Sequence, residues 1–142
     1  MPSLKTSLKA VNVTKINPVN QLWTFGGEDG LVEFWDPRHR SNLTTLNVPK
    51  ALLESNTTST MDWDSVPEVT AIEYGWDGLS VAIGTSSGHV LLYDLRNPTP
   101  MVIKDHQYGC PIKGIQFHGD KVVSADTKIC KVWDRNDVWT NS

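Results

Sequence analysis

A glycine-rich stretch near the start of the chain contains the residue types that bind phosphate in many proteins. It reads TFGGEDGLVEFWDPR (residues 24–38) and holds three glycines within five positions. The backbone N–H groups of such a loop cradle a phosphate when a helix follows it. This stretch lacks the Gly-Lys-Ser/Thr ending of a P-loop, and a strand-like alternation follows it instead. The glycines therefore predict a hairpin turn and not a nucleotide site.

Side chains suited to catalysis or metal binding are sparse. Cys110 and Cys130 are the only cysteines, and the four histidines show no metal-ligand spacing with them. The sequence contains neither a Gly-X-Ser-X-Gly elbow nor a His-Glu-X-X-His motif. We therefore expect no enzymatic activity, no cofactor and no metal site. Two cysteines are also too few for a disulfide framework, which favours a reducing intracellular compartment.

Charge and hydropathy argue against two classes of partner. Among 142 residues, 13 Lys and Arg stand against 16 Asp and Glu, so no basic field draws the chain to nucleic acid. Any contact with RNA is expected to be indirect. No apolar run approaches the roughly 20 residues of a membrane span, and the N-terminal residues lack the apolar segment of a signal peptide. We expect neither membrane association nor export.

The chain repeats itself. Residues 24–38 align without a gap with residues 82–96 (AIGTSSGHVLLYDLR), and the same frame continues into VVSADTKICKVWD at residues 122–134. The alignment places one aromatic residue and a following Asp at the same position in every unit: Trp35 and Asp36, Tyr93 and Asp94, Trp133 and Asp134. A period near 40 residues that ends in Trp-Asp is typical of a β-propeller blade made of four strands.

The repeats predict an all-β chain of three consecutive four-stranded antiparallel blades. We expect one partial propeller domain, residues 1–142, with blades at about residues 10–48, 69–107 and 111–142. The predicted strands are residues 11–16, 21–26, 31–36 and 41–46 in the first blade, 69–74, 80–84, 89–94 and 100–105 in the second, and 112–117, 121–125 and 129–134 in the third. Gly30 and Gly88 fall at the same hairpin position, where a positive φ lets the turn follow the twist of its strands.

The polar segment 49–68 lengthens the first repeat interval. Its Ser, Thr and Asn content and its flanking prolines predict an insertion loop, either passive or used for docking.

The tryptophans fall into two groups. Trp23, Trp35 and Trp133 lie in predicted strands and are expected in the core, whereas Trp63, Trp76 and Trp139 lie in polar or turn segments and are candidate partner anchors.

These Trp-Asp units resemble the WD-repeat family. In that family a His before the inner strand, a Ser or Thr, an Asp in the tight turn and the Trp form a hydrogen-bonded tetrad. The resemblance implies a structural role for His106 toward Trp133, with Ser124 or Asp126 as intermediates. Asp29 lies at the family's Asp position in the first unit, but the first two units have no matching His. Their blades are expected to depend mainly on packing.

Four segments narrow the resemblance further: VEFWDPR, AIGTSSGHVLLYDLR, IKDHQYGCPIKGI and SADTKICKVWD. Together they are similar to the nucleolar protein ten family, called essential nuclear protein two in yeast, over nearly the whole chain. The resemblance implies a nuclear, nucleolar scaffold for protein binding in the small-subunit processome, the particle that matures small ribosomal subunit RNA. It implies other ribosome-assembly proteins as partners. Members of the family are longer and carry further blades, so the chain resembles a fragment of a seven-bladed propeller.

The most distinctive segment of this resemblance is KDHQYG, residues 104–109. Gln107 and Tyr108 have no place in the tetrad, and the segment holds more hydrogen-bonding and aromatic capacity than a short connection needs. We expect Lys104, Gln107 and Tyr108 to contact a partner. Trp63 in the polar insertion is a further candidate.

Arg38 and Arg96 support a rival function. They end the sequences Trp-Asp-Pro-Arg and Tyr-Asp-Leu-Arg, which resemble the Trp-Asp-X-Arg motif of substrate receptors for cullin-type ubiquitin ligases. The alternative is structural: each arginine covers a blade edge and pairs with a neighbouring carboxylate.

Three blades leave two sheet flanks uncovered, because a propeller closes with about 4 to 8 blades. The sequence is therefore expected to be part of a longer protein, or to self-associate through its exposed flanks.

Overall fold

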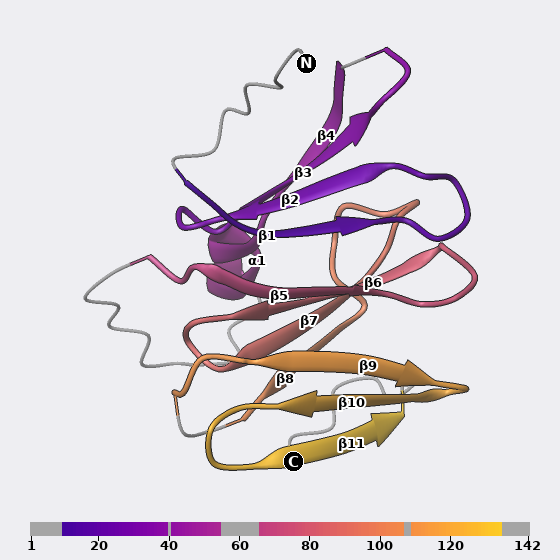
Figure 1. The fold of residues 1–142 in the computed structure, drawn as a ribbon. Helices are drawn as coiled ribbons and strands as arrows, with labels where there is room; N and C mark the ends of the chain where they lie inside the picture. Colours follow the sequence, from indigo (N-terminus) through magenta and orange to yellow (C-terminus); the bar gives the residue numbers. More distant parts are fainter. Residues whose placement is uncertain (1–9, 40, 55–65, 107–108, 135–142) are drawn as a thin grey trace.

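The computed structural model describes residues 10–39, 41–54, 66–106 and 109–134 (Figure 1). Their elements form three groups along the chain. The first group is β1 (Val11–Ile16), β2 (Trp23–Gly27), β3 (Leu31–Asp36) and β4 (Ser41–Asn47), followed by the helix α1 (Val48–Glu54). The second is β5 (Val69–Tyr74), β6 (Ser80–Thr85), β7 (His89–Asp94) and β8 (Val102–Asp105), and the third is β9 (Gly114–His118), β10 (Lys121–Ala125) and β11 (Cys130–Asp134).

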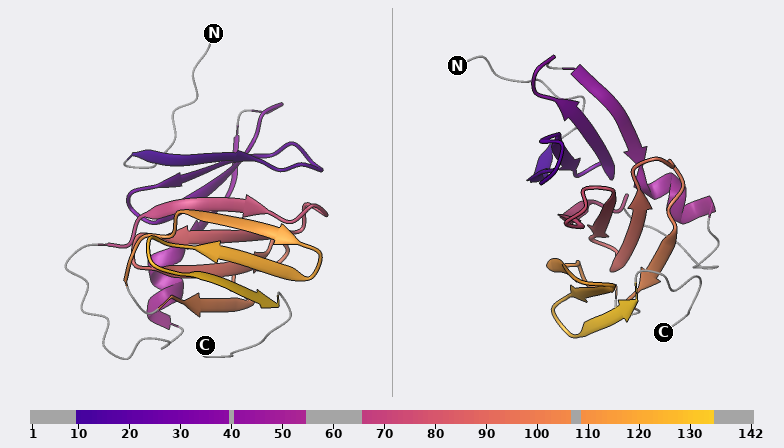
Figure 2. Two further views of the ribbon diagram at one scale, coloured as in Figure 1. Left: turned by 60° about the horizontal axis from the view of Figure 1, so that its bottom comes forward. Right: turned by 90° about the vertical axis from the view of Figure 1, so that its right-hand side faces the viewer.

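Each group forms one antiparallel sheet whose strands pair in chain order. The first and second sheets have four strands, as predicted. The third has three within the described ranges, and the rest of its predicted blade, residues 135–142, lies outside them. The sheets stand side by side in chain order, with the second between the other two (Figures 1 and 2). Strands β1 and β9 both contact β5, so the first strands of the sheets are neighbours.

The predicted insertion loop is helical at its start, and this part of the prediction is wrong. Two local features favour α1. The Asn47 side chain accepts a hydrogen bond from the Lys50 N–H at 3.0 Å, which caps the helix. Val48 and Leu52, four residues apart, are both fully buried and fix one apolar face. The prediction of a loop relied on the polar residues further along the insertion, and it overlooked this short amphipathic pattern.

The apolar core lies between the sheets and covers both faces of the second one. Every residue of β6 is buried, because its alternate side chains face the first and the third sheet. The core between the first and second sheets includes Val32, Phe34, Leu46, Ile83, Leu91, Tyr93 and Ile103, together with Val48 and Leu52 of α1. The core between the second and third sheets includes Ala82, Val90, Leu92, Ile112, Ile115, Val122 and Trp133.

In each of the first two sheets, a glycine in the second strand admits a branched side chain from the next sheet or from the segment that leads into it. A Cβ built on Gly84 would lie 2.6 Å from Cγ2 and 2.7 Å from Cβ of Ile112. A Cβ on Gly26 would overlap the side chain of Val69 in the same way. Here the glycines allow close approach between sheets, a role distinct from the turn glycine Gly30, whose φ is 80°. We call Gly26 and Gly84 the notch glycines.

Buried polar groups also join neighbouring sheets. Thr24 and Tyr74 share a hydrogen bond between their hydroxyl groups across the first junction, and burial raises the pKa of Tyr74 to about 12. At the second junction, Thr70 Oγ1 donates to the Ile112 carbonyl at 2.7 Å. These bonds satisfy polar groups that the packed sheets remove from water.

Asn17 links the turns of the first two sheets and is completely buried. Its Nδ2 donates to the Gly78 carbonyl at 2.9 Å, and its Oδ1 accepts from the Val19 N–H at 2.9 Å. Asn17→Ala is expected to lower the free energy of unfolding by about 1–3 kcal/mol, because it leaves buried partners unpaired. Urea unfolding measures the change. Asn20→Ala, at an exposed residue of the same turn, should have a much smaller effect, and equal losses would contradict this role.

Candidate functional site

Four side chains between the second and third sheets form one directed chain of hydrogen bonds. Trp133 Nε1 on β11 donates to Ser124 Oγ on β10 at 3.2 Å. Ser124 Oγ lies 2.7 Å from His106 Nε2, and His106 Nδ1 lies 3.0 Å from Asp126 Oδ2. With the Nδ1 proton directed at the carboxylate, Nε2 accepts from the Ser124 hydroxyl. The structure thus brings together the four residues that the WD-repeat resemblance indicated.

The Asp126 carboxylate also closes the turn between β10 and β11. Its Oδ1 accepts from the backbone N–H groups of Lys128 at 2.6 Å and Ile129 at 2.8 Å. The Ile129 N–H makes the largest contribution to lowering the pKa of Asp126, with further contributions from Lys128 and His106. The carboxylate therefore stays charged and connects the turn to the His106 ring.

The junction between the first two sheets replaces this network with apolar packing. The His106 N–H donates to the Gly88 carbonyl at 2.9 Å, and the Val48 N–H donates to the Gly30 carbonyl at 3.2 Å. Val48 therefore takes the place of His106 one repeat earlier. By strand register, Ile83 and Tyr93 correspond to Ser124 and Trp133. All three apolar counterparts belong to one buried cluster.

Aligning the repeats on their aromatic residues did not identify Val48 as the counterpart of His106, because the long insertion changes the spacing before the second sheet. The shared bond to the hairpin glycine is the signal that aligns it with His106. Burial raises the pKa of Tyr93 and keeps its hydroxyl neutral in this apolar junction.

The predicted structural residues of the first sheet make local contacts. Trp35 is half-buried, and its Nε1 donates to Glu33 Oε1 at 2.9 Å. Asp29 Oδ1 accepts from the Leu31 N–H at 3.3 Å within the β2–β3 turn. These bonds are local to β3 and its preceding turn, whereas the His106 chain joins two sheets.

The aspartates that follow the aromatic residues pair with nearby cations. Arg96 makes a two-pronged contact with Asp94, with Nε to Oδ1 at 2.9 Å and Nη2 to Oδ2 at 2.6 Å. Arg38 Nε lies 3.9 Å from Asp36 Oδ1, and the Arg38 side chain is 85% exposed. The Arg96 geometry matches the structural alternative for the Trp-Asp-X-Arg motif.

The last of these aspartates, Asp134 on β11, forms an ion pair with a lysine on the neighbouring strand β10. Lys121 Nζ on β10 lies 3.3 Å from Asp134 Oδ2. Both side chains are partly exposed, so the pair contributes little to stability.

The prediction of a partner contact does not hold for Lys104. Lys104 is only 2% exposed, and its Nζ lies 5.8 Å from the centroid of the Trp133 ring. Alternation along β8 directs this side chain toward the third sheet, where its ammonium group lies over the ring of Trp133. Gln107, Tyr108 and Trp63, the other partner candidates, lie outside the described residues.

A second polar chain surrounds His89, to which the sequence assigned no role. His89 Nδ1 lies 2.8 Å from Ser87 Oγ, which lies 2.8 Å from Thr85 Oγ1. On the opposite side, His89 Nε2 is buried and lies 3.7 Å from Asp105 Oδ2, directly across from it on β8. The sequence TSSGH carries a recognisable signal, since small hydroxyl residues before a hairpin glycine form such turns.

Acid is expected to weaken the fold through His89. Its pKa lies below the ordinary value of 6.5, mainly because burial disfavours the imidazolium form, although Asp105 acts in the opposite direction. Below pH 6.5 the unfolded chain therefore binds more protons than the folded one. The stability is complete above pH 6.5 and is lost as the pH falls from there toward the folded-state pKa.

Urea unfolding between about pH 7.5 and pH 5 measures this dependence. His89→Gln, which does not titrate, should show a shallower decline than the unsubstituted protein. His118→Gln, at an exposed histidine, should decline as steeply as the unsubstituted protein. An unchanged slope for His89→Gln would show that its protonation is not the cause.

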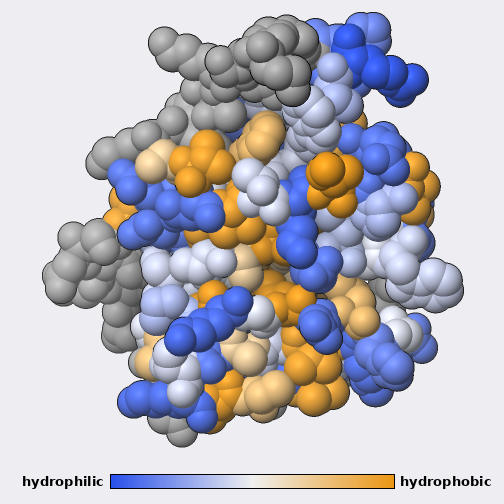
Figure 3. All heavy atoms as spheres, viewed as in Figure 1, coloured by the Kyte–Doolittle hydropathy of each residue, from blue (hydrophilic) through white to orange (hydrophobic). Residues whose placement is uncertain are grey.

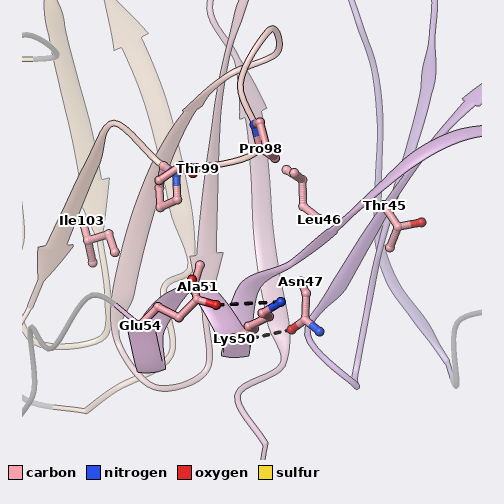
Figure 4. A pocket seen from close by; sticks show the side chains of 10 residues that line it. Thr45, Leu46, Asn47, Lys50, Ala51, Glu54, Pro98, Thr99 and Ile103 are labelled. Atoms are coloured by element: carbon pink, nitrogen blue, oxygen red, sulfur yellow. Dashed lines mark hydrogen bonds and ion pairs between the residues drawn. The ribbon is translucent and has the colours of Figure 1, made fainter.

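A groove of about 540 Å³ opens at the outer end of the first junction (Figure 4). Strand β4 and helix α1 form one side, and the segment from Pro98 into β8 forms the other. It is lined by Thr45, Leu46, Asn47, Lys50, Ala51, Glu54, Pro98, Thr99, Pro100 and Ile103. Elsewhere, apolar side chains form small groups among polar ones on the face shown in Figure 3. The most exposed large apolar residue in the described ranges is Trp76, at 76%.

Neither a metal centre nor a membrane helix emerges from the described parts of the chain. Within these ranges, no three His, Cys, Asp or Glu side chains gather closely enough to hold a metal ion. No described helix has the length and apolar character needed to cross a membrane.

Comparison with known proteins identifies close relatives over nearly the whole chain. A family model described as "Nucleolar protein 10-like, N-terminal domain" matches residues 1–141. Nucleolar protein 10 of Xenopus laevis is 46% identical over 137 residues, which are 95% of this chain and 19% of that protein. The ribosome biogenesis protein enp2 homolog of Schizosaccharomyces pombe is 46% identical over 132 residues, 89% of this chain and 20% of that protein. The chain thus spans about a fifth of the length of these relatives.

Solved structures identify the fold. The β-propeller domain of Cps50 (Swd1) from Myceliophteria thermophila has a TM-score of 0.73 at 14% identity, covering 96% of this chain and 39% of that one. The WD40 repeats of RRP9 match with the same score and coverage at 16% identity. The prediction of WD-repeat propeller blades is confirmed, and the coverage fits part of a larger propeller.

Proposed function

Because the chain belongs to the family of Nucleolar protein 10-like N-terminal domains, we propose that it serves ribosome biogenesis as a non-enzymatic protein-binding scaffold in the nucleolus. The observation that carries this proposal is the identity of 41–46% to proteins named Nucleolar protein 10 and to a ribosome biogenesis protein, over about nine-tenths of the chain or more. The finer role is in the small-subunit processome, with other assembly proteins as partners and RNA reached only through them.

The geometry is suited to a scaffold. Two packed junctions, joined by buried and partly buried hydrogen bonds, hold the sheets in fixed relation, so surface residues on different sheets keep a constant spacing. Rigid presentation of this kind lowers the ordering cost when a partner binds. Gln107, Tyr108 and Trp63 are proposed contacts on this scaffold.

Proximity labelling from the intact protein in growing cells tests the function. Under this proposal, small-subunit precursor proteins dominate the labelled set. A labelled set dominated by the adaptor of a cullin-type ligase, and lost in an Arg38→Ala, Arg96→Ala double variant, would instead establish the rival function. Labelling confined to proteins outside the nucleolus would refute both the localisation and the role.

Tyr108→Ala examines the proposed contact within the same experiment. We expect it to reduce labelling of assembly proteins while leaving thermal stability nearly unchanged, because an interface aromatic contributes to binding and not to folding. Asn20→Ala, in an exposed turn of the first sheet, serves as the matched surface control. Unfolding of the Tyr108→Ala protein, with normal labelling by the folded fraction, would assign Tyr108 a structural role.

A further inference from the structure

Strand β4 is the outer edge of the first sheet and is open to solvent. It ends the strand order of that sheet, so its second edge has no strand partner in the described parts of the chain. Every residue of β4 except Leu46 is exposed. The free edge of a seven-residue strand presents a row of backbone donors and acceptors to any extended chain that approaches it.

The edge of β4 lacks most of the features that usually prevent strand pairing, although a register shift near its start leaves Leu43 without a partner on β3. Proteins protect open edges with charges, prolines or very short strands. The sequence SNLTTLN contains no charge and no proline. The equivalent outer strand of the second sheet, β8, has four residues, two of them charged, and follows Pro98 and Pro100. The outer edge of β4 therefore has the character of an edge that can pair with another strand, whereas the outer edge of β8 is protected.

Strand register identifies which backbone groups face the open edge. The Val48 N–H bonds to the Gly30 carbonyl, and bonded pairs alternate along an antiparallel ladder. Leu46, paired with Val32, then bonds to β3, whereas Thr45, paired with Glu33, directs its N–H outward. A chain added beside β4 would bond to Thr45 without disturbing the existing sheet.

The groove lies beside this edge and continues an established interface. Leu46 and Ile103, which line it, are members of the core between the first two sheets. The two charges at the groove, Lys50 and Glu54, lie 3.8 Å apart and neutralise each other (Figure 4). An apolar, uncharged side chain in the groove would extend the core, and a charged one would lose solvation without a free counter-charge.

We propose that β4 and the groove together bind an extended, uncharged segment of another assembly protein. The segment adds a fifth strand to the first sheet and places an aliphatic side chain in the groove. Alternate side chains of the added strand face the second sheet, which is the side on which the groove opens. The identity of the partner as an assembly protein rests on the proposed function, whereas the binding chemistry rests on the geometry of β4 and α1.

A labelled peptide tests the binding chemistry on the intact protein. The probe is a fluorescein-labelled Thr-Val-Thr-Leu-Thr-Val-Thr peptide, and its control carries Lys in place of Leu. Fluorescence anisotropy should show the first peptide binding at least about tenfold more tightly than the second.

Three variants test the site itself. Thr45→Pro removes an outward donor, Thr45→Lys keeps the donor but adds a charge to the edge, and Ala51→Trp fills the groove from α1. Each should weaken binding of the first peptide by at least about tenfold. Leu79→Lys, at an exposed apolar residue in the turn between β5 and β6, adds the same charge elsewhere and should bind normally. The Lys and Trp variants keep the test decisive where Thr45→Pro disturbs folding.

Three results would overturn the proposal: no binding of the first peptide, equal binding of both peptides, or unchanged binding by all three variants. Self-association that Thr45→Pro abolishes, without peptide binding, would show that a second copy occupies the edge and would also overturn it. The proximity labelling tests the proposed function and the anisotropy measurement tests binding at β4, so the two proposals can fail independently.

Discussion

Gly84→Ala is expected to lower the free energy of unfolding by about 1–3 kcal/mol, although alanine suits a strand better than glycine does. The new methyl group would lie 2.6–2.7 Å from Ile112, a distance that real Cβ atoms do not tolerate. Ala71 lies 3.2 Å away on the neighbouring strand, so the methyl group has little room to shift within its own sheet. The second and third sheets must therefore move apart, and urea unfolding measures the cost.

Gly114→Ala provides the matched control. Gly114 lies in β9 of the third sheet, and a Cβ there would meet nothing within 4 Å. Its effect should stay within about 0.5 kcal/mol. Combining Gly84→Ala with Ile112→Ala should cost less than the sum of the two single changes, because the two changes act on one contact. Equal losses for Gly84→Ala and Gly114→Ala would rule out the notch as the cause.

His106→Ala is expected to produce a loss of similar size, about 1–3 kcal/mol, by a different mechanism. His106 is fully buried, and its removal leaves the Ser124 hydroxyl without its acceptor and the Asp126 carboxylate without its ring partner. The near-ultraviolet circular dichroism of the buried Trp133 should also change, since its indole bonds to the same hydroxyl.

His118→Ala removes an exposed histidine from β9 and serves as the control for His106→Ala. It should leave both the free energy of unfolding and the near-ultraviolet spectrum nearly unchanged. If His106→Ala unfolds at the same urea concentration as the unsubstituted protein, the hydrogen-bond chain contributes nothing net and packing alone holds the third sheet.

Strand positions were predictable because the repeats fix them three times over. β1, β3, β5, β7 and β10 have the bounds that alternation and turn residues indicated. Helix α1 was missed, since seven residues give too short a pattern to separate from a polar loop, and its stability comes from Val48 and Leu52 packing on the sheets. Tertiary contacts of this kind leave little trace in the local sequence.

The candidate site was only partly predictable. The resemblance to WD repeats related His106 to Trp133 and offered Ser124 or Asp126 as intermediates, but it did not show that both take part. Lys104 was misassigned, since a charged residue next to a loop usually faces water, and only the alternation of β8 directs it inward. The edge of β4 carries no motif at all, and its openness depends on which strand lies beside it.

The notch glycines have a consequence for how the protein tolerates damage. Across the junctions, Gly26 meets Val69 and Ile72 of the second sheet, whereas Gly84 meets Ile112 just before the third, so each sheet depends on its immediate neighbours. An error at one junction therefore weakens that junction and leaves the other in place. Among the three described sheets, only the second takes part in both junctions, so a fault there reaches both of its neighbours.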